Sequence, residues 1–308
     1  MKQDWTVDEI IGHFTLLEEE QEFIKSNAPH NKLGKALLLK FFQYEFRFPE
    51  DQSEIPRQAI DYIAQQLDLS PDIFESYNWY GRSIKTHRKD IREVLGFRPA
   101  TLSDQDSLHN WLLNEIIPGE HRPTYLEELT YSQLRELYIE PPSRKQINRL
   151  ITSAIYNHEQ RLFTQTSESL PAETKAQLRN LIQNTGELDE DLLVDADELL
   201  DYPIHELKVG AGGPQVKNIK RVCARLKRLQ DIDLPTDLFE GIPLRFLRQY
   251  RQQVAVESPS HLQMHDKSKL GEAQTLTMLA VFCWVRQQEI TDDLADLFIR
   301  VLKDIRLR

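Results

Sequence analysis

The sequence predicts an all-α protein built as a multi-domain array of helices. Apolar residues recur at intervals of three and four along most of the 308 residues, whereas alternating Val- and Thr-rich runs are scarce. The 11 glycines are too few for the many turns of a β-sandwich or a doubly wound sheet. We therefore expect helices to dominate, in two or three domains for a chain of this length.

Proline and glycine punctuation divides the first part of the chain into helical segments. A buried helix is predicted over 30–47, and Pro56 opens a second one that reaches Leu67. The remaining predictions are a short piece ending at Phe74 and helices over 82–95, 102–117 and 125–138.

The second part begins with the clearest helix. Ser143 and Gln146 form a predicted capping box ahead of an apolar stripe that reaches Leu162. Over 167–204 the net charge is −8, which predicts a polar hairpin or inter-domain region, partly helical over 172–182. The glycines from 210 to 213 predict a flexible joint before further helices from Val216 onward.

The last predicted helix starts at Thr291, with Asp292 and Asp293 in its first turn, and runs to Arg308 without a stop signal. This pattern is typical of a piece of a longer protein. We expect three domains: 1–100, 101–204 with the acidic connecting segment, and 205–308, truncated at its C-terminal end. The first two are each expected to contain a helix-turn-helix-like DNA-binding unit.

Composition excludes several classes of protein. A formal charge of −11 argues against coating nucleic acid or an anionic membrane with the whole surface, so an anion site must be local. Cys223 and Cys283 have no CxxC or His-spaced partner, which excludes a disulfide framework or a zinc site. No signal peptide or run of ~18 apolar residues is present, so we expect no membrane contact and a cytoplasmic, nucleoid-associated protein.

The first basic stretch covers 76–98 and has a local charge of +4. Four cations at helical spacing share one face of the predicted helix, about a third of a turn from an apolar face. Preceded by a helix and a turn, this helix resembles the last helix of a helix-turn-helix, which enters a major groove. A solvated helix face is the equally weighted alternative. The candidate DNA-binding residues are Arg82, Lys85, Arg88, Lys89 and Arg92.

The second basic stretch begins the helix after Ser143. Its first two turns are where a recognition helix places its base-reading side chains, and Arg can read guanine and Asn adenine. Cations at the start of a helix are unfavourable because they oppose the helix dipole. An ordinary surface helix is therefore an alternative of equal weight to a DNA-contacting helix. The candidates are Ser143, Arg144, Lys145, Asn148 and Arg149.

The third basic stretch, 214–230, carries six cations and no acid. Because they lie on several faces, the pattern favours phosphate contact over base reading. Packing of this helix against the acidic residues of 187–201 is the alternative. The candidates are Lys217, Lys220, Arg221 and Arg225.

Signals for catalysis are weak. The glycines from 210 to 213 follow no predicted strand and lack the P-loop pattern. His261 and His265 have the spacing of metal ligands but no evident third ligand. We expect no catalytic residue, metal or cofactor in this chain.

The stretch from His30 to Leu37, HNKLGKAL, resembles the HNRLGFALQL stretch of the Tn-three family of large replicative transposases, which act on long terminal inverted repeats. Further landmarks follow in the same order along almost the whole chain. They are Ile55-Pro56, 64–67, 80–88, 95–98, Ile139, 141–150, 276–282 and 290–302. Lys35 departs from the family by replacing the usual aromatic residue, which affects only local packing.

The resemblance implies the DNA-binding front end of such a transposase, with terminal inverted-repeat DNA as its partner and Lys32 among its DNA contacts. The DDE catalytic core of the family, which would use Mg²⁺, lies in the half that is absent here, and a homodimer is expected in the full-length protein. A free-standing regulator derived from a truncated transposase and an acidic helical scaffold for protein partners are the alternatives.

Overall fold

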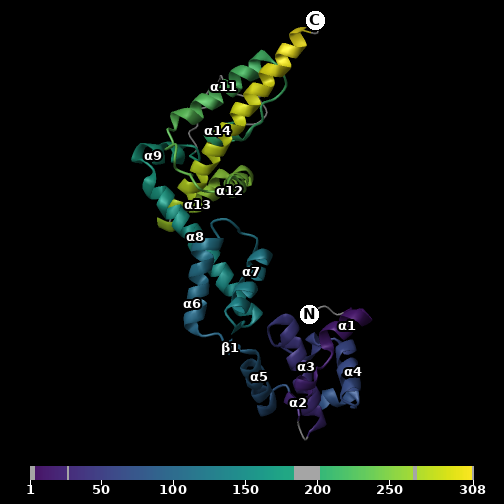
Figure 1. Cartoon of the computed structure of the whole chain (residues 1–308). Coiled ribbons are helices and arrows are strands. Elements are labelled where there is room, and N and C mark those ends of the chain that lie inside the picture. Colours follow the sequence, from purple (N-terminus) through teal and green to yellow (C-terminus); the bar gives the residue numbers. More distant parts are fainter. Residues whose placement is uncertain (1–3, 26–27, 184–201, 266–268, 307–308) are drawn as a thin grey trace. The chain divides into compact units, whose positions relative to one another are not determined.

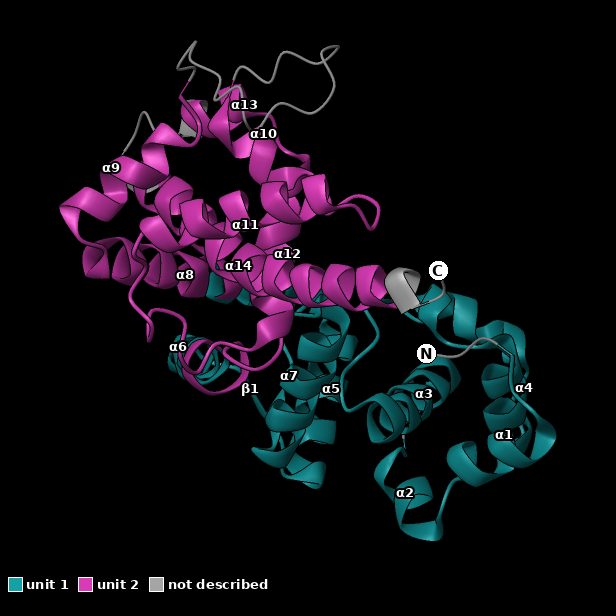
Figure 2. Ribbon diagram, turned by 90° about the horizontal axis from the view of Figure 1, so that it is seen from above, with its two compact units in different colours: residues 1–112, 121–154 teal, residues 113–120, 155–308 magenta. Residues whose placement is uncertain are grey.

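The computed structural model describes residues 4–25, 28–183, 202–265 and 269–306 (Figure 1). These residues form helices joined by short connections, and the predicted all-α fold class is confirmed. The described strands are β1 (Arg98–Pro99) and β2 (Ile139–Glu140), a single parallel pair. The chain divides into two compact units (Figure 2): unit 1, of residues 1–112 and 121–154, and unit 2, of residues 113–120 and 155–308. The division into three domains stays a prediction.

Unit 1 reproduces the predicted helices within a few residues, and the one over 82–95 has its predicted limits. Two short helices near its N-terminus were not predicted, because segments this short carry little periodicity. The elements are α1 (Val7–Phe14), α2 (Glu18–Phe23), α3 (Pro29–Glu45), η1 (Gln52–Glu54), α4 (Arg57–Gln66), η2 (Pro71–Ser76), α5 (Arg82–Leu95), α6 (Leu102–Trp111), α7 (Pro123–Glu136) and the start of α8 (Arg144–Ser169).

Helix α3 is the centre of the first core, and every residue of its stretch 33–42 is buried. Helices α1, α4 and α5 and the 3₁₀ turn η2 pack against it. The unusual Lys35 is accommodated at the edge of this core. Its ammonium pairs with Asp90 of α5 at 2.8 Å and lies 4.0 Å from the centre of the Phe23 ring. Pairing and cation–π contact offset the burial of this charge.

Unit 2 is organised around one long helix. Helices α9, α11, α12 and α13 all pack on α14, whose residues 276 to 283 are buried. The elements are η3 (Leu112–Ile116), a π-helical turn at the edge of the unit, the rest of α8, α9 (Ala172–Asn180), α10 (Pro203–Lys208), α11 (Val216–Asp231), α12 (Leu244–Val256), α13 (Pro259–His265) and α14 (Lys269–Arg306).

The predicted helix start at Thr291 is wrong. Thr291 lies inside α14, and its hydroxyl donates to the carbonyl of Gln287 at 2.8 Å. This bond to the preceding turn satisfies the hydroxyl without ending the helix. Asp292 and Asp293 are therefore mid-helix residues. The helix start was predicted at Thr291 because acidic residues are common in the first turn of a helix, but they also occur within helices.

The segment before the predicted glycine joint is anchored by two buried arginines. Arg225 donates to the carbonyls of Val209 and Gly210 at 3.3 and 3.0 Å. Arg286 donates to the carbonyls of Leu207 and Val209 at 2.8 and 2.7 Å. The acidic residues of 187–201, expected to form a hairpin or to shield α11, lie outside the described residues. None of the described helices is long and apolar enough to cross a bilayer.

Gly34 supports a first prediction. A Cβ at Gly34 would lie 2.3 Å from the Tyr77 ring, whereas one at Gly12 of α1 would meet nothing within 4 Å. We expect Gly34→Ala to destabilise the protein by about 1–3 kcal/mol through overpacking, and Gly12→Ala to stabilise it by about 0.5–1 kcal/mol. Urea unfolding followed by tryptophan fluorescence is suitable, because Trp79 packs edge-on against Tyr77. Equal midpoints for the two variants would contradict this account of the α3–Tyr77 contact.

Candidate nucleic-acid interface

Helix α5 presents fewer cations than its sequence pattern predicts. Its ends are set by Gly81 and by Gly96, which adopts φ +74° and caps the last turn. Ile84, His87 and Ile91 face the core. The exposed cations are Arg82, Lys85 and Lys89.

Arg88 and Arg92 instead point to the chain that follows α3. Arg88 donates to the carbonyl of Pro49 at 2.8 Å and lies 5.3 Å from the centre of the Phe48 ring. Arg92 pairs with Glu140 at 2.6 Å. Both side chains are half-buried. The predicted face of four cations is therefore split between a structural pair and an exposed pair.

His87 is the buried polar residue on the core side of α5. Its Nδ1 lies 2.8 Å from the Tyr77 hydroxyl, and the two rings are stacked. Burial, together with the nearby Lys35 and against the opposing effect of Asp90, lowers the pKa of His87 to about 4. His87 is thus neutral at pH 7 and helps to hold α5 on the core.

The start of α8 has the predicted geometry. The Ser143 amide donates to the Gln146 side chain at 3.0 Å, and the Gln146 amide is 3.4 Å from the Ser143 hydroxyl, which confirms the capping box. Ile147 is buried behind it, as are Ile151 and Ala154. The candidates on the opposite side are all exposed: Ser143, Arg144, Lys145, Asn148 and Arg149.

Arg144 has an anchor that the sequence did not reveal. Its Nε and one Nη donate to the two carboxylate oxygens of Glu127 in α7, at 2.7 and 3.3 Å. The Arg144 side chain is 71% exposed and that of Glu127 only 16%. The hydrogen bond to Glu127 raises the pKa of Arg144. The fixed carboxylate of Glu127 therefore holds the exposed guanidinium of Arg144 in place. The N–H groups that do not bind Glu127 can still donate to two acceptor atoms of a ligand.

Both basic surfaces of unit 1 meet the residues Phe46–Glu50, which we call the clamp segment. Phe46 has φ +56°, contacts the Phe97 ring and lies under the Arg135 guanidinium at 3.9 Å. The Glu50 carboxylate accepts from the Arg144 amide at 3.3 Å. Together with the contacts of Arg88, these interactions position α5, α7 and the start of α8 around one short segment.

Helix α11 in unit 2 has three exposed lysines, Lys217, Lys220 and Lys227. Arg225 is 3% exposed, and burial lowers its pKa; it binds backbone carbonyls and is not on the surface. Arg221 is half-buried. In unit 1, Lys32 is a half-buried residue of α3.

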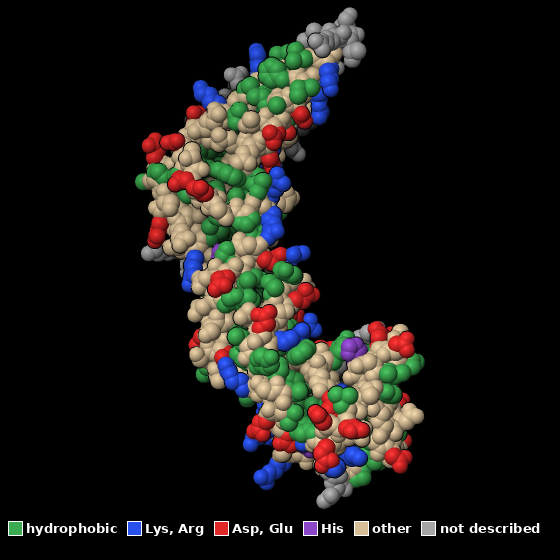
Figure 3. All heavy atoms as spheres, in the orientation of Figure 1, with side chains coloured by type: hydrophobic (Ala, Val, Ile, Leu, Met, Phe, Trp, Pro, Cys, Tyr) green, Lys and Arg blue, Asp and Glu red, His purple; other side chains and the backbone are tan. Residues whose placement is uncertain are grey.

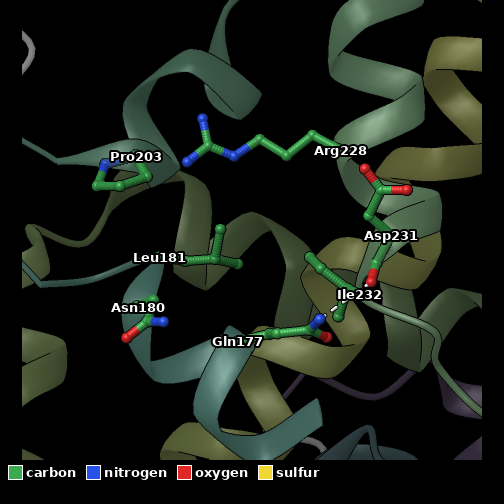
Figure 4. A pocket seen from close by; sticks show the side chains of 7 residues that line it. All are labelled: Gln177, Asn180, Leu181, Pro203, Arg228, Asp231 and Ile232. Carbon is green, nitrogen blue, oxygen red and sulfur yellow. Dashed lines mark hydrogen bonds between the residues drawn. The ribbon is translucent and has the colours of Figure 1, made fainter. Parts of the chain in front are cut away.

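A pocket of about 470 Å³ in unit 2 shows no catalytic arrangement (Figure 4). The Arg228 guanidinium at its rim is paired with Glu206 at 2.5 Å, and the Gln177 amide donates to the Asp231 carbonyl at 3.2 Å. The other lining residues are Asn180, Leu181, Pro203 and Ile232. Among the described residues, no three His, Cys, Asp or Glu side chains converge as metal ligands.

Residues 1–154 match the family model described as a domain of unknown function, DUF4158. The chain belongs to this family. It is also 24% identical over 287 residues to the transposase for transposon Tn1546 of Enterococcus faecium, covering 92% of this chain and 27% of that protein. The transposases for Tn21 of Escherichia coli and Tn501 of Pseudomonas aeruginosa are 24% and 23% identical, covering 96% of this chain and 28% of each relative.

These relatives confirm the resemblance to Tn-three family transposases over nearly the whole of this DUF4158 chain. The chain spans about 28% of the length of the relatives from Tn21 and Tn501. The exposed basic surfaces of α5 and α8 both lie in unit 1, and their cations belong to the part of the chain that matches the family model.

The lowered pKa of His87 predicts a pH dependence of stability. Below pH 6.5 the unfolded chain binds a proton at this residue, whereas the folded chain does not until about pH 4. Stability is therefore lost as the pH falls through this window, by on the order of 2 kcal/mol. In His87→Gln, whose amide can still bond to Tyr77, this contribution should vanish. Urea unfolding at pH 7, 5.5 and 4.5 tests it; an unchanged pH dependence in the variant would refute it.

Proposed function

We propose that this chain binds the terminal inverted-repeat DNA of a transposon in a sequence-specific way, as the DNA-binding part of a Tn-three family transposase. The observation that carries the proposal is the exposed, pre-oriented basic start of α8 in a chain whose net charge is −11. Relationship to several transposases supports it. Local cations in an acidic protein bind DNA in one orientation, because the rest of the surface is repelled.

The side chains divide by the contacts they can make. Arg144 and Asn148 have the functional groups that read guanine and adenine in the major groove, and they lie in the first two turns of α8. Lys145 and Arg149 contribute phosphate contacts beside them, and Lys32 of α3 contributes a further phosphate contact. We also assign to α4, η2 and α5 the role of a helix-turn-helix-like unit, with Arg82, Lys85 and Lys89 directed to the DNA.

In unit 2, Lys217 and Lys220 contribute phosphate contacts. Arg221 and Arg225 support α11 through their contacts within unit 2, and Arg88 and Arg92 support α5 through their contacts within unit 1. The chain itself performs no chemistry in this proposal; catalysis with Mg²⁺, and dimerisation, belong to the longer protein, in the bacterial cytoplasm at the nucleoid.

Two other functions make different predictions. A free-standing regulator would bind the same DNA and repress, without a transposase continuing from the chain. A scaffold for protein partners would show no binding to DNA. Binding to duplex DNA over a range of salt concentrations separates the scaffold, because phosphate contacts give a steep negative slope of log K against log salt.

Alanine substitutions test the division between base and phosphate contacts. Arg144→Ala and Asn148→Ala should each weaken binding to the inverted repeat by about 1–3 kcal/mol and relax one position of the site. Lys217→Ala and Lys220→Ala should weaken all sequences alike and lower the salt slope by about one each. Binding to the repeat and to a scrambled duplex is measured by fluorescence anisotropy. If Arg144→Ala weakens both duplexes equally, base reading by Arg144 is wrong.

Glu127 provides a test of the anchored arginine, with Glu128 as a matched control. Both residues are on α7, but Glu128 is exposed and does not hold Arg144 in the structure. Either Glu→Gln change removes one negative charge, and both should strengthen binding to scrambled DNA slightly. Only Glu127→Gln should weaken binding to the repeat, by on the order of 1 kcal/mol, because Arg144 must then be ordered on binding. Stronger binding of both duplexes by Glu127→Gln would show that Glu127 only competes with phosphate.

A further inference from the structure

Helix α12 has a composition unlike that of the other surface helices. Its 13 residues, LRFLRQYRQQVAV, contain three arginines and three glutamines and no acidic residue or lysine. Surface helices usually mix charges of both signs on the solvated face. This helix was not among the basic stretches identified from the sequence.

Two of the arginines and all three glutamines lie on one face. Phe246, Leu247, Tyr250 and Val254 are buried on the other side, against the core of unit 2. The exposed polar residues follow at the spacing of a single helix face. They are Arg245, Arg248, Gln249, Gln252 and Gln253.

The rotation of α12 is fixed by two contacts on its protein side. The Tyr250 hydroxyl donates to Glu159 of α8 at 3.1 Å, and its ring packs edge-on against Phe163. Arg251 pairs with Glu289 of α14 at 2.6 Å. With these two residues held, the Arg248, Gln249 and Gln252 side chains must face outward.

The outward side chains retain most of their hydrogen-bonding capacity. Among the described residues Arg248 and Gln249 have no side-chain partner, and Gln252 accepts one long bond from its neighbour Arg251 at 3.3 Å. Arg245, at the N-terminal end, donates to the carbonyl of Gly119 and is less available. In Figure 3, Lys or Arg side chains protrude at the edge of unit 2 beside α12.

We propose that the exposed face of α12 is a second DNA-reading surface, which contacts base edges in a major groove through Arg248, Gln249 and Gln252. Arginine binds guanine through O6 and N7, and glutamine binds adenine through N6 and N7, each with two hydrogen bonds. The polar side chains of this face are all arginine or glutamine, and both types can bind one base edge with two hydrogen bonds, whereas a phosphate contact requires only a positive charge or a single donor. The inference rests on the proposed function, since it assigns a second part of the same DNA site.

The test identifies the DNA sequence and its readers together. The full chain is used to select binders from a library of DNA duplexes. Each duplex has a random region of about 30 base pairs, which corresponds to about three helical turns. The selection is repeated with Arg248→Ala, Gln249→Ala and Gln252→Ala. Matched controls are Arg300→Ala and Gln165→Ala, which change exposed residues of the same types on other helices of unit 2.

We expect each α12 variant to lose sequence preference at one or two positions of the selected motif and to bind the wild-type motif about 5- to 100-fold more weakly. Methylation of guanine N7 at the position lost with Arg248→Ala should block binding by the wild type and have no effect on that variant. The controls should select the wild-type motif. Because all the changes are on exposed side chains, circular dichroism and the unfolding midpoint should be unchanged.

The outcomes separate this inference from the proposed function. If Arg144→Ala changes the motif and the α12 variants do not, the α12 face is ordinary solvated surface and the inference is overturned. If the α12 variants weaken all sequences equally, the face contacts phosphate and base reading is overturned. If only the α12 variants change the motif, the role of α8 is wrong and that of α12 stands. If the wild-type chain selects no motif, both fail.

Discussion

The clamp segment, Phe46–Glu50, is the constraint on which the candidate interface depends. Its oxygen atoms accept hydrogen bonds from the Arg88 side chain of α5 and the Arg144 amide of α8. Its aromatic rings make cation–π contacts with Arg92 of α5 and Arg135 of α7. Phe46 adopts a left-handed conformation there, which is unfavourable for a bulky residue and persists only because its surroundings over-determine it. The contacts of Phe46 with Phe97 and Arg135 supply that support, so the relative placement of α5 and α8 follows from one strained turn.

Desolvation decides which cations remain exposed. A guanidinium removed from water must find acceptors, and the buried Arg225 and Arg286 and the half-buried Arg88 each donate to backbone carbonyls. Lysines are hydrated more strongly, and those of α11 stay at the surface. Local positive charge in the sequence therefore overstates the candidate interface: α5 and α11 each divide into arginines that hold the fold and cations that face water, whereas the cations at the start of α8 are all exposed.

Local patterns predicted the helices, the capping box at Ser143 and the exposure of Arg144 and Asn148, because helix period and capping act within a few residues. Partners from distant segments left no such signal. Glu140 lies 48 positions from Arg92, and Glu127 is on a different helix from Arg144. Helix α12 was not predicted to bind DNA for a different reason. Segments of the sequence were compared by their net charge, whereas the distinguishing feature of α12 is that the polar residues of one face are all arginine or glutamine.

Anchoring of this kind bears on specificity. Ordering a long side chain on binding costs about 0.5–1.5 kcal/mol, and a fixed carboxylate behind it removes much of that cost. Arg144 has such an anchor in Glu127. In α12, Glu159 and Glu289 hold Tyr250 and Arg251, so they fix the rotation of the helix and not the outward side chains themselves. Lys85 of α5 has no ion-pair partner among the described residues, and its ammonium binds as a point charge without a preferred plane. In the proposed complex with DNA, discrimination between sequences should therefore concentrate on the start of α8 and the fixed face of α12, and Lys85 of α5 should contribute mainly to affinity.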